Sequence, residues 1–90
     1  MSLYVATYDI SHTGRRSRVA RILQGYGRRI QRSVFELWLE PEDLPDLRRR
    51  VGPLLARTDH FDLIPVDLRR PEHRLRWQRP PDNWEPVLLL

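Results

Sequence analysis

The apolar positions of residues 1–68 follow the patterns of strands and helices in turn. Residues 3–8 form a run with little polar alternation, which is typical of a strand that is buried on both faces and central in its sheet. After a turn at residues 11–14, apolar side chains recur with the i, i+3, i+4 and i+7 spacing of an amphipathic helix: Val19, Ile22, Leu23 and Tyr26. Gly27 follows at the position where a left-handed C-terminal cap is expected.

Residues 28–39 are rich in strand-forming side chains and present apolar groups on two faces. One face carries Ile30, Val34 and Trp38, and the other carries Phe35, Leu37 and Leu39. The segment is longer than an ordinary strand, yet it holds no Gly, Pro, Asn or Asp to mark a turn. We therefore expect two strands with a bend or bulge near residues 31–33.

A second helix is expected to begin at residues 40–43, where acidic side chains suit a helix N-terminus and Pro41 suits a first turn. Its apolar face consists of Leu44, Leu47, Val51 and Leu54. Gly52 and Pro53 should end the helix near Val51. The acids Glu40, Glu42, Asp43 and Asp46 could hold a hard cation, but a solvated first turn is the simpler interpretation.

The next strand is expected at residues 61–68, and Pro65 within it favours an edge position in the sheet. Three acids flank this strand or alternate along it, and we expect them to face solvent: Asp59, Asp62 and Asp67.

The tail, residues 69–90, is rich in proline and contains two short strand-like pieces, 74–78 and 87–90. These pieces could add to a sheet edge in this chain or in a neighbouring one. The order strand, helix, two strands, helix, strand favours an α+β sandwich with both helices on one sheet face, and the ferredoxin-like βαββαβ arrangement is its simplest form. We expect a single domain over residues 1–90, with its core at residues 1–68.

The composition excludes several classes of site. The chain has no cysteine, which excludes disulfides, thiolate metal sites and cysteine nucleophiles. His12, His60 and His73 share no metal-ligand spacing, and the four glycines match no nucleotide-binding loop. No apolar stretch approaches the roughly 20 residues of a membrane span, and the N-terminus lacks the charged head of a signal peptide. We therefore expect a cytoplasmic protein with no membrane partner.

Positive charge is concentrated in the first part of the chain. The formal net charge is +4, all sixteen basic side chains are arginine, and seven of them lie in residues 1–35 beside a single acid. Clustered cations gain affinity for nucleic acid by releasing counterions, and the planar fork of arginine suits phosphate. The distribution predicts a phosphate-rich partner, with a solvated basic face as the alternative.

Asp9 is that single acid, and it ends the first strand beside the arginine-rich segment. A carboxylate in this place could hold a metal ion that assists attack on a phosphodiester, or it could be a helix cap or an arginine clamp. Magnesium keeps several waters and often needs only one or two carboxylates. A twofold dimer that brings Asp9 of each chain to one cleft would supply the second carboxylate, and flanking arginines would position the phosphodiester.

Several short motifs occur in order between residues 3 and 68. They are Tyr8-Asp9-Ile10, Arg16 with Arg18 and Val19, Tyr26-Gly27, and the stretch Arg-Ile-Gln-Arg-Ser-Val-Phe-Glu at residues 29–36. In order and spacing these motifs resemble the CRISPR-associated protein 2 family. The resemblance implies a homodimer with a ferredoxin-like fold that takes part in spacer acquisition beside the CRISPR integrase. It also implies an extra C-terminal strand at the dimer interface, which would involve the tail in dimerisation.

For activity, the resemblance implies a magnesium-dependent endonuclease that cleaves single-stranded RNA or double-stranded DNA. Asp9 would be the catalytic metal ligand, with one Mg²⁺ shared between the two Asp9 of a dimer, and Tyr8 a second catalytic residue. The positions that match substrate-contacting residues of the family are Arg16, Arg18, Arg29 and Phe35. Structural roles are the alternative for Tyr8, Phe35 and Arg29. A non-catalytic scaffold that holds nucleic acid for a partner is the alternative for the whole protein.

Overall fold

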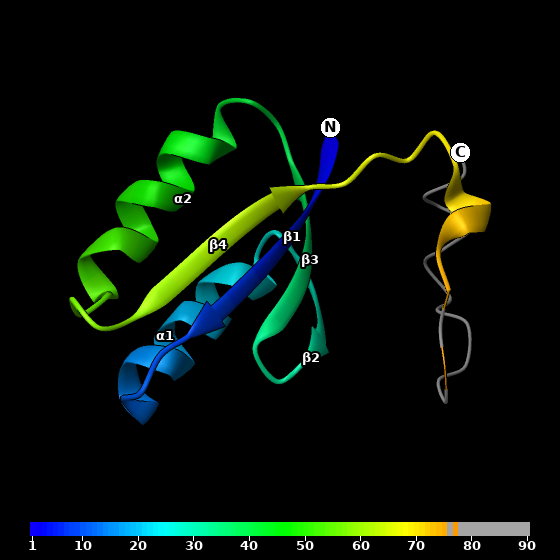
Figure 1. The fold of residues 1–90 in the computed structure, drawn as a ribbon. Coiled ribbons are helices and arrows are strands. Elements are labelled where there is room, and N and C mark those ends of the chain that lie inside the picture. Colours follow the sequence, from blue (N-terminus) through cyan, green and yellow to red (C-terminus); the bar gives the residue numbers. More distant parts are fainter. Residues whose placement is uncertain (76, 78–90) are drawn as a thin grey trace.

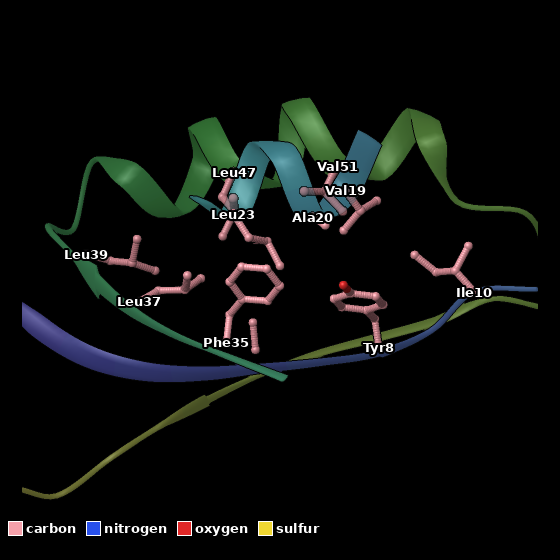
Figure 2. Packing of buried hydrophobic residues seen from close by; sticks show 11 residues of the cluster. Tyr8, Ile10, Val19, Ala20, Leu23, Phe35, Leu37, Leu39, Leu47 and Val51 are labelled. Atoms are coloured by element: carbon pink, nitrogen blue, oxygen red, sulfur yellow. The ribbon is translucent and has the colours of Figure 1, made fainter. Parts of the chain in front are cut away.

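A computed structural model describes residues 1–75 and residue 77 of the chain (Figure 1). In chain order the elements are β1 (Ser2–Asp9), α1 (Thr13–Gln24), β2 (Gly27–Gln31), β3 (Val34–Leu39), α2 (Asp43–Val51), the short 3-10 helix η1 (Gly52–Leu54), β4 (His60–Pro65) and a second 3-10 turn, η2 (Pro71–His73). The strands form one antiparallel sheet in the order β2-β3-β1-β4. Both α-helices cover one face of this sheet (Figure 2), so the predicted α+β ferredoxin-like fold is confirmed.

β1 is a central strand, as its apolar run predicts, and it pairs with β3 on one side and β4 on the other. Ala6 and Tyr8 lie in the core beneath the helices, whereas Thr7 and Asp9 alternate to the opposite face of the sheet. We call this opposite face the far face. The core contains Ala6, Tyr8, Ile10, Val19, Ala20, Leu23, Phe35, Leu37, Leu39, Leu47 and Val51 (Figure 2). The alternation therefore places Asp9 on the side of the sheet away from the helices.

The break expected near residues 31–33 is confirmed. β2 ends at Gln31, β3 begins at Val34, and the pairing register shifts between Arg29 and Gln31. This shift is a bulge that bends the hairpin without a glycine or proline at its tip.

The prediction of a left-handed C-terminal cap at Gly27 is wrong. α1 ends at Gln24, and Gly25 caps it in a right-handed conformation with its N–H donating to the carbonyl of Ile22. Gly27 begins β2, where an added Cβ would lie 1.9 Å from the carbonyl oxygen of Glu36. Glycine is required at position 27 because the backbones of β2 and β3 approach closely there.

The second half of the fold largely matches the pattern of its apolar residues. α2 ends at Val51, where Gly52 and Pro53 begin η1, as predicted. β4 is an edge strand of the described sheet, as Pro65 predicts, but it ends at Pro65 and does not extend to residue 68. In the described part of the chain, no helix is long and apolar enough to cross a membrane.

After β4 the chain returns to the far face. Nη1 of Arg74 lies 2.5 Å from Oε2 of Glu36, a β3 side chain that is only 3% exposed. Arg74 and Leu75 form no strand within this chain, and pairing of the segment 74–78 with a neighbouring chain stays a prediction. The strand predicted at residues 87–90 lies outside the described residues. The ion pair fixes the segment that follows η2 against the sheet.

Candidate functional site

Asp9 is the last residue of β1 and is exposed at the end of the sheet. His60, the first residue of β4, is its register partner. Within residues 1–75 and 77, the Asp9 carboxylate makes no hydrogen bond or ion pair. It does not cap α1, because Nδ1 of His12 accepts the N–H of Arg15 at 3.2 Å and fills that role. The carboxylate is therefore available to a ligand.

Arg16 does not clamp Asp9 either. Its Nη1 donates to the carbonyl of Ile10 at 3.0 Å, and its Nη2 donates to Oγ1 of Thr13 at 3.2 Å. Arg16 therefore braces the loop between β1 and α1. Since a guanidinium carries five N–H donors, it can still offer hydrogen bonds to a phosphate beside this loop.

Asp59 is the residue of this region that sequence reasoning missed. Its side chain is 1% exposed, and its Oδ2 accepts from Nη2 of Arg15 at 2.9 Å and from the N–H of Ala56 at 2.8 Å. Its Oδ1 accepts the N–H of Ser11 at 3.4 Å. The expectation that Asp59 faces solvent is wrong. Arg15 lies 44 residues away in the chain, so no local pattern marks the pair.

The hydrogen bonds of Asp59 also change its acidity. The N–H of Ala56, followed by the guanidinium of Arg15 and the N–H of Ser11, holds the pKa of Asp59 below its ordinary value of 3.8, although burial opposes this shift. Asp59 is therefore an anion that joins the β1–α1 loop to the loop before β4. Both loops lie next to Asp9 and His60.

Tyr8 and Phe35 lie in the core (Figure 2). Their side chains are 5% and 0% exposed, and their ring centroids are 6.4 Å apart in a stacked arrangement. The Tyr8 hydroxyl donates to the carbonyl of Arg32 at 3.3 Å. The burial of both rings favours the structural alternative for them.

Arg18 and Arg29 are exposed and remain available to a polyanion. The guanidinium of Arg29 lies 5.2 Å from the ring centroid of Phe35, its register partner. Because Phe35 points to the helices, Arg29 lies on the helix side of the sheet, whereas Asp9 lies on the far face. The structure thus gathers Arg15 and Arg16 near Asp9 but not Arg29.

One protomer offers few ligands to a metal ion. In the described part of the chain, no group of three or more His, Asp or Glu side chains could hold a metal ion. Mg²⁺ nevertheless binds through one or two carboxylates while it keeps most of its waters. The exposed, unpartnered carboxylate of Asp9 fits such a site.

Comparisons with known proteins agree with this architecture. The family model described as CRISPR associated protein Cas2 matches residues 1–74. A relative from Thermus thermophilus, named CRISPR-associated endonuclease Cas2 2, is 49% identical over 65 residues, which cover 71% of this chain and 72% of the relative. CRISPR-associated endoribonuclease Cas2 3 from Synechocystis is 45% identical over 82 residues, covering 90% of this chain and 89% of that protein.

Solved structures share the fold. The crystal structure of a hypothetical protein from Thermus thermophilus matches with a TM-score of 0.71 and 43% identity, covering 73% of this chain and 82% of that one. Streptococcus pyogenes Cas2 matches with a TM-score of 0.75 at 23% identity, covering 83% of this chain and 98% of that one. The match of the family model to most of the chain, together with these relatives, shows that the protein belongs to the CRISPR-associated Cas2 family.

Proposed function

We propose that the protein is a homodimeric, magnesium-dependent endonuclease of CRISPR adaptation that cleaves phosphodiester bonds of single-stranded RNA or double-stranded DNA. The observation that carries this proposal is the exposed carboxylate of Asp9, which has no partner in the described part of the chain. The names endonuclease and endoribonuclease that its relatives carry support nuclease activity.

In this proposal Asp9 would hold Mg²⁺, which when bound would lower the pKa of a coordinated water and neutralise charge on the phosphate. Arg16 stands at the same end of the sheet and donates hydrogen bonds to the phosphate oxygens. Asp59 and Arg15 keep the β1–α1 loop in place. Arg18 and Arg29 are exposed and hold the flanking nucleotides through their charge. Tyr8 supports the end of β1 from inside the core.

The far face is where we place the second protomer. Ile64 lies on this face with 50% exposure, and Leu68, just beyond β4, is 36% exposed. A chain of 90 residues buries a limited share of its surface, so a dimer would add needed stability. Packing two far faces together would bring the two Asp9 carboxylates to one site, with the tail, residues 69–90, contributing to the interface.

The second candidate function is a non-catalytic scaffold that holds DNA for the CRISPR integrase. The burial of Tyr8 and Phe35 favours it, because it leaves Asp9 as the main candidate for chemistry. A fold neighbour with a TM-score of 0.75 and 21% identity was solved as part of a partial Cas6-RT-Cas1–Cas2 complex.

The test is an Asp9→Asn variant, measured for magnesium-dependent cleavage of single-stranded RNA and duplex DNA and for spacer acquisition in cells. Glu42→Gln is the control, since Glu42 is an exposed acid that precedes α2 and makes no capping hydrogen bond. We expect cleavage to be lost in the first variant and kept in the second. Lost cleavage with intact acquisition would favour the scaffold as the cellular role. Unchanged cleavage by Asp9→Asn would overturn the site.

A further inference from the structure

His60 is the cross-strand neighbour of Asp9 in the sheet. The two residues are the last register pair of the antiparallel β1–β4 ladder, which begins at Tyr4 and Pro65. Residues directly opposite in such a ladder have Cβ atoms about 4.5–5.5 Å apart and point to the same face. Both residues are exposed. The imidazole and the carboxylate therefore lie side by side on the far face of one protomer.

This pair is held in place at the strand ends, where ladders ordinarily fray. Asp59 immediately precedes His60, and its carboxylate accepts the N–H of Ser11, which lies two residues beyond Asp9. Arg15 adds its own bond to the same buried carboxylate. A side-chain connection thus closes the ladder just past the pair, so that Asp9 and His60 have a fixed spacing.

The pair is not an ordinary ion pair. Within the described residues, no hydrogen bond or salt bridge joins Asp9 to His60, and neither side chain is bonded to another group. His12 differs, because its Nδ1 already accepts the N–H of Arg15. Of these two histidines near the site, only His60 has both ring nitrogens available.

We infer that Asp9 and His60 of the same protomer together ligate the divalent cation, which gives this chain a mixed carboxylate–imidazole site. This inference rests on the proposed metal site at Asp9. Imidazole suits Zn²⁺, whereas Mg²⁺ favours oxygen ligands alone. The site should therefore bind Zn²⁺ more tightly than Mg²⁺, and His60 should contribute to that preference.

Calorimetric titration of the protein with Zn²⁺ or Mg²⁺ alone tests this assignment without reference to activity. His60→Gln should weaken Zn²⁺ binding by about tenfold or more while changing Mg²⁺ binding little. His12→Gln is the matched control and should leave both affinities near those of the wild type. Thermal unfolding of each variant verifies that it remains folded, which the exposure of both histidines favours.

A second measurement follows the imidazole nitrogens by NMR during titration with Zn²⁺. Direct ligation should shift one ring nitrogen of His60 and leave those of His12 in place. Unchanged Zn²⁺ affinity in His60→Gln, or an unshifted His60 imidazole at saturating Zn²⁺, would overturn the inference. Such a result alongside lost cleavage in Asp9→Asn would leave the proposed nuclease intact. Confirmed ligation by His60 with unaffected cleavage in Asp9→Asn would instead show that Asp9 is not the catalytic residue of the proposed nuclease, while the metal site would stand.

Discussion

Arg15 and Asp59 form an ion pair with an Nη2–Oδ2 distance of 2.9 Å that ties the first turn of α1 to the loop before β4. Nε of Arg15 also lies 3.3 Å from the same oxygen. The carboxylate is almost completely buried and accepts two backbone N–H groups in addition. The pair therefore joins the two loops that flank the Asp9 end of the sheet.

Replacing Asp59 with Asn should lower the thermal unfolding midpoint at neutral pH. The amide keeps one acceptor oxygen but turns an NH₂ donor toward Arg15 or a backbone N–H, which leaves buried donors facing each other. Asp67→Asn is the control, because Asp67 forms an exposed pair with Arg69. Equal midpoints for the Asp59 and Asp67 variants would show that the buried pair does not stabilise the fold.

The same pair predicts how stability depends on pH. Because the pKa of Asp59 is lower in the folded chain than its ordinary value of 3.8, the unfolded chain takes up this proton first as the solution is acidified. The stability that the Asp59 carboxylate contributes is complete above that ordinary value and is lost as the pH falls through the folded pKa.

Thermal unfolding of wild type and Asp59→Asn as a function of pH measures this loss. The difference between the two midpoints should be largest near neutrality and should shrink below about pH 4. Asp67 also has a lowered pKa, because the side chain of Arg69 donates to it, but the pair is exposed and Asp67→Asn should alter the acid limb less. Parallel curves for wild type and Asp59→Asn would contradict the role of Asp59.

Substitutions of Phe35 separate packing from substrate contact. Phe35→Ala should lower the free energy of unfolding by about 3–5 kcal/mol, because the ring is fully buried and leaves a cavity. Phe35→Leu should recover much of that loss, and the folded variant should cleave and bind nucleic acid like the wild type. A folded Phe35→Leu variant with lost binding would point to a direct contact with substrate.

The arginines should differ in what they contribute. Arg18→Ala and Arg29→Ala should each reduce the slope of log affinity for nucleic acid against log salt by about one, because both side chains are exposed. Arg16→Ala should also lower the unfolding midpoint, since it removes the hydrogen bonds to Ile10 and Thr13. Arg48, an exposed arginine of α2, is the control. A slope unchanged by Arg18→Ala and Arg29→Ala would remove both from the binding surface.

The elements could be predicted because their signals are local. The apolar run at residues 3–8 indicates a central strand. Gly52 and Pro53 end α2 whatever tertiary contacts the helix makes. The role of Gly27 could not be predicted from its local sequence. Glycine is needed there because the backbone carbonyl of Glu36, on the neighbouring strand, leaves no room for a side chain.

The candidate site could be predicted only in part. The position of Asp9 at a strand end follows from the sequence, but its neighbours follow from the strand register and from contacts between distant segments. His60 becomes adjacent to Asp9 only when β4 pairs with β1, and Asp59 becomes buried only when its loop meets Arg15. Neither the Asp9–His60 pairing nor the Arg15–Asp59 contact could be predicted from the spacing of these residues along the chain.

A site completed by dimerisation is most directly tested by mixing wild-type and Asp9→Asn chains and measuring magnesium-dependent cleavage against the wild-type fraction. If one ion is shared by two Asp9 carboxylates, only dimers of two wild-type chains cleave, and an equal mixture after subunit exchange should retain about a quarter of the activity. Retention of about half would mean that each chain cleaves independently and would contradict the shared site.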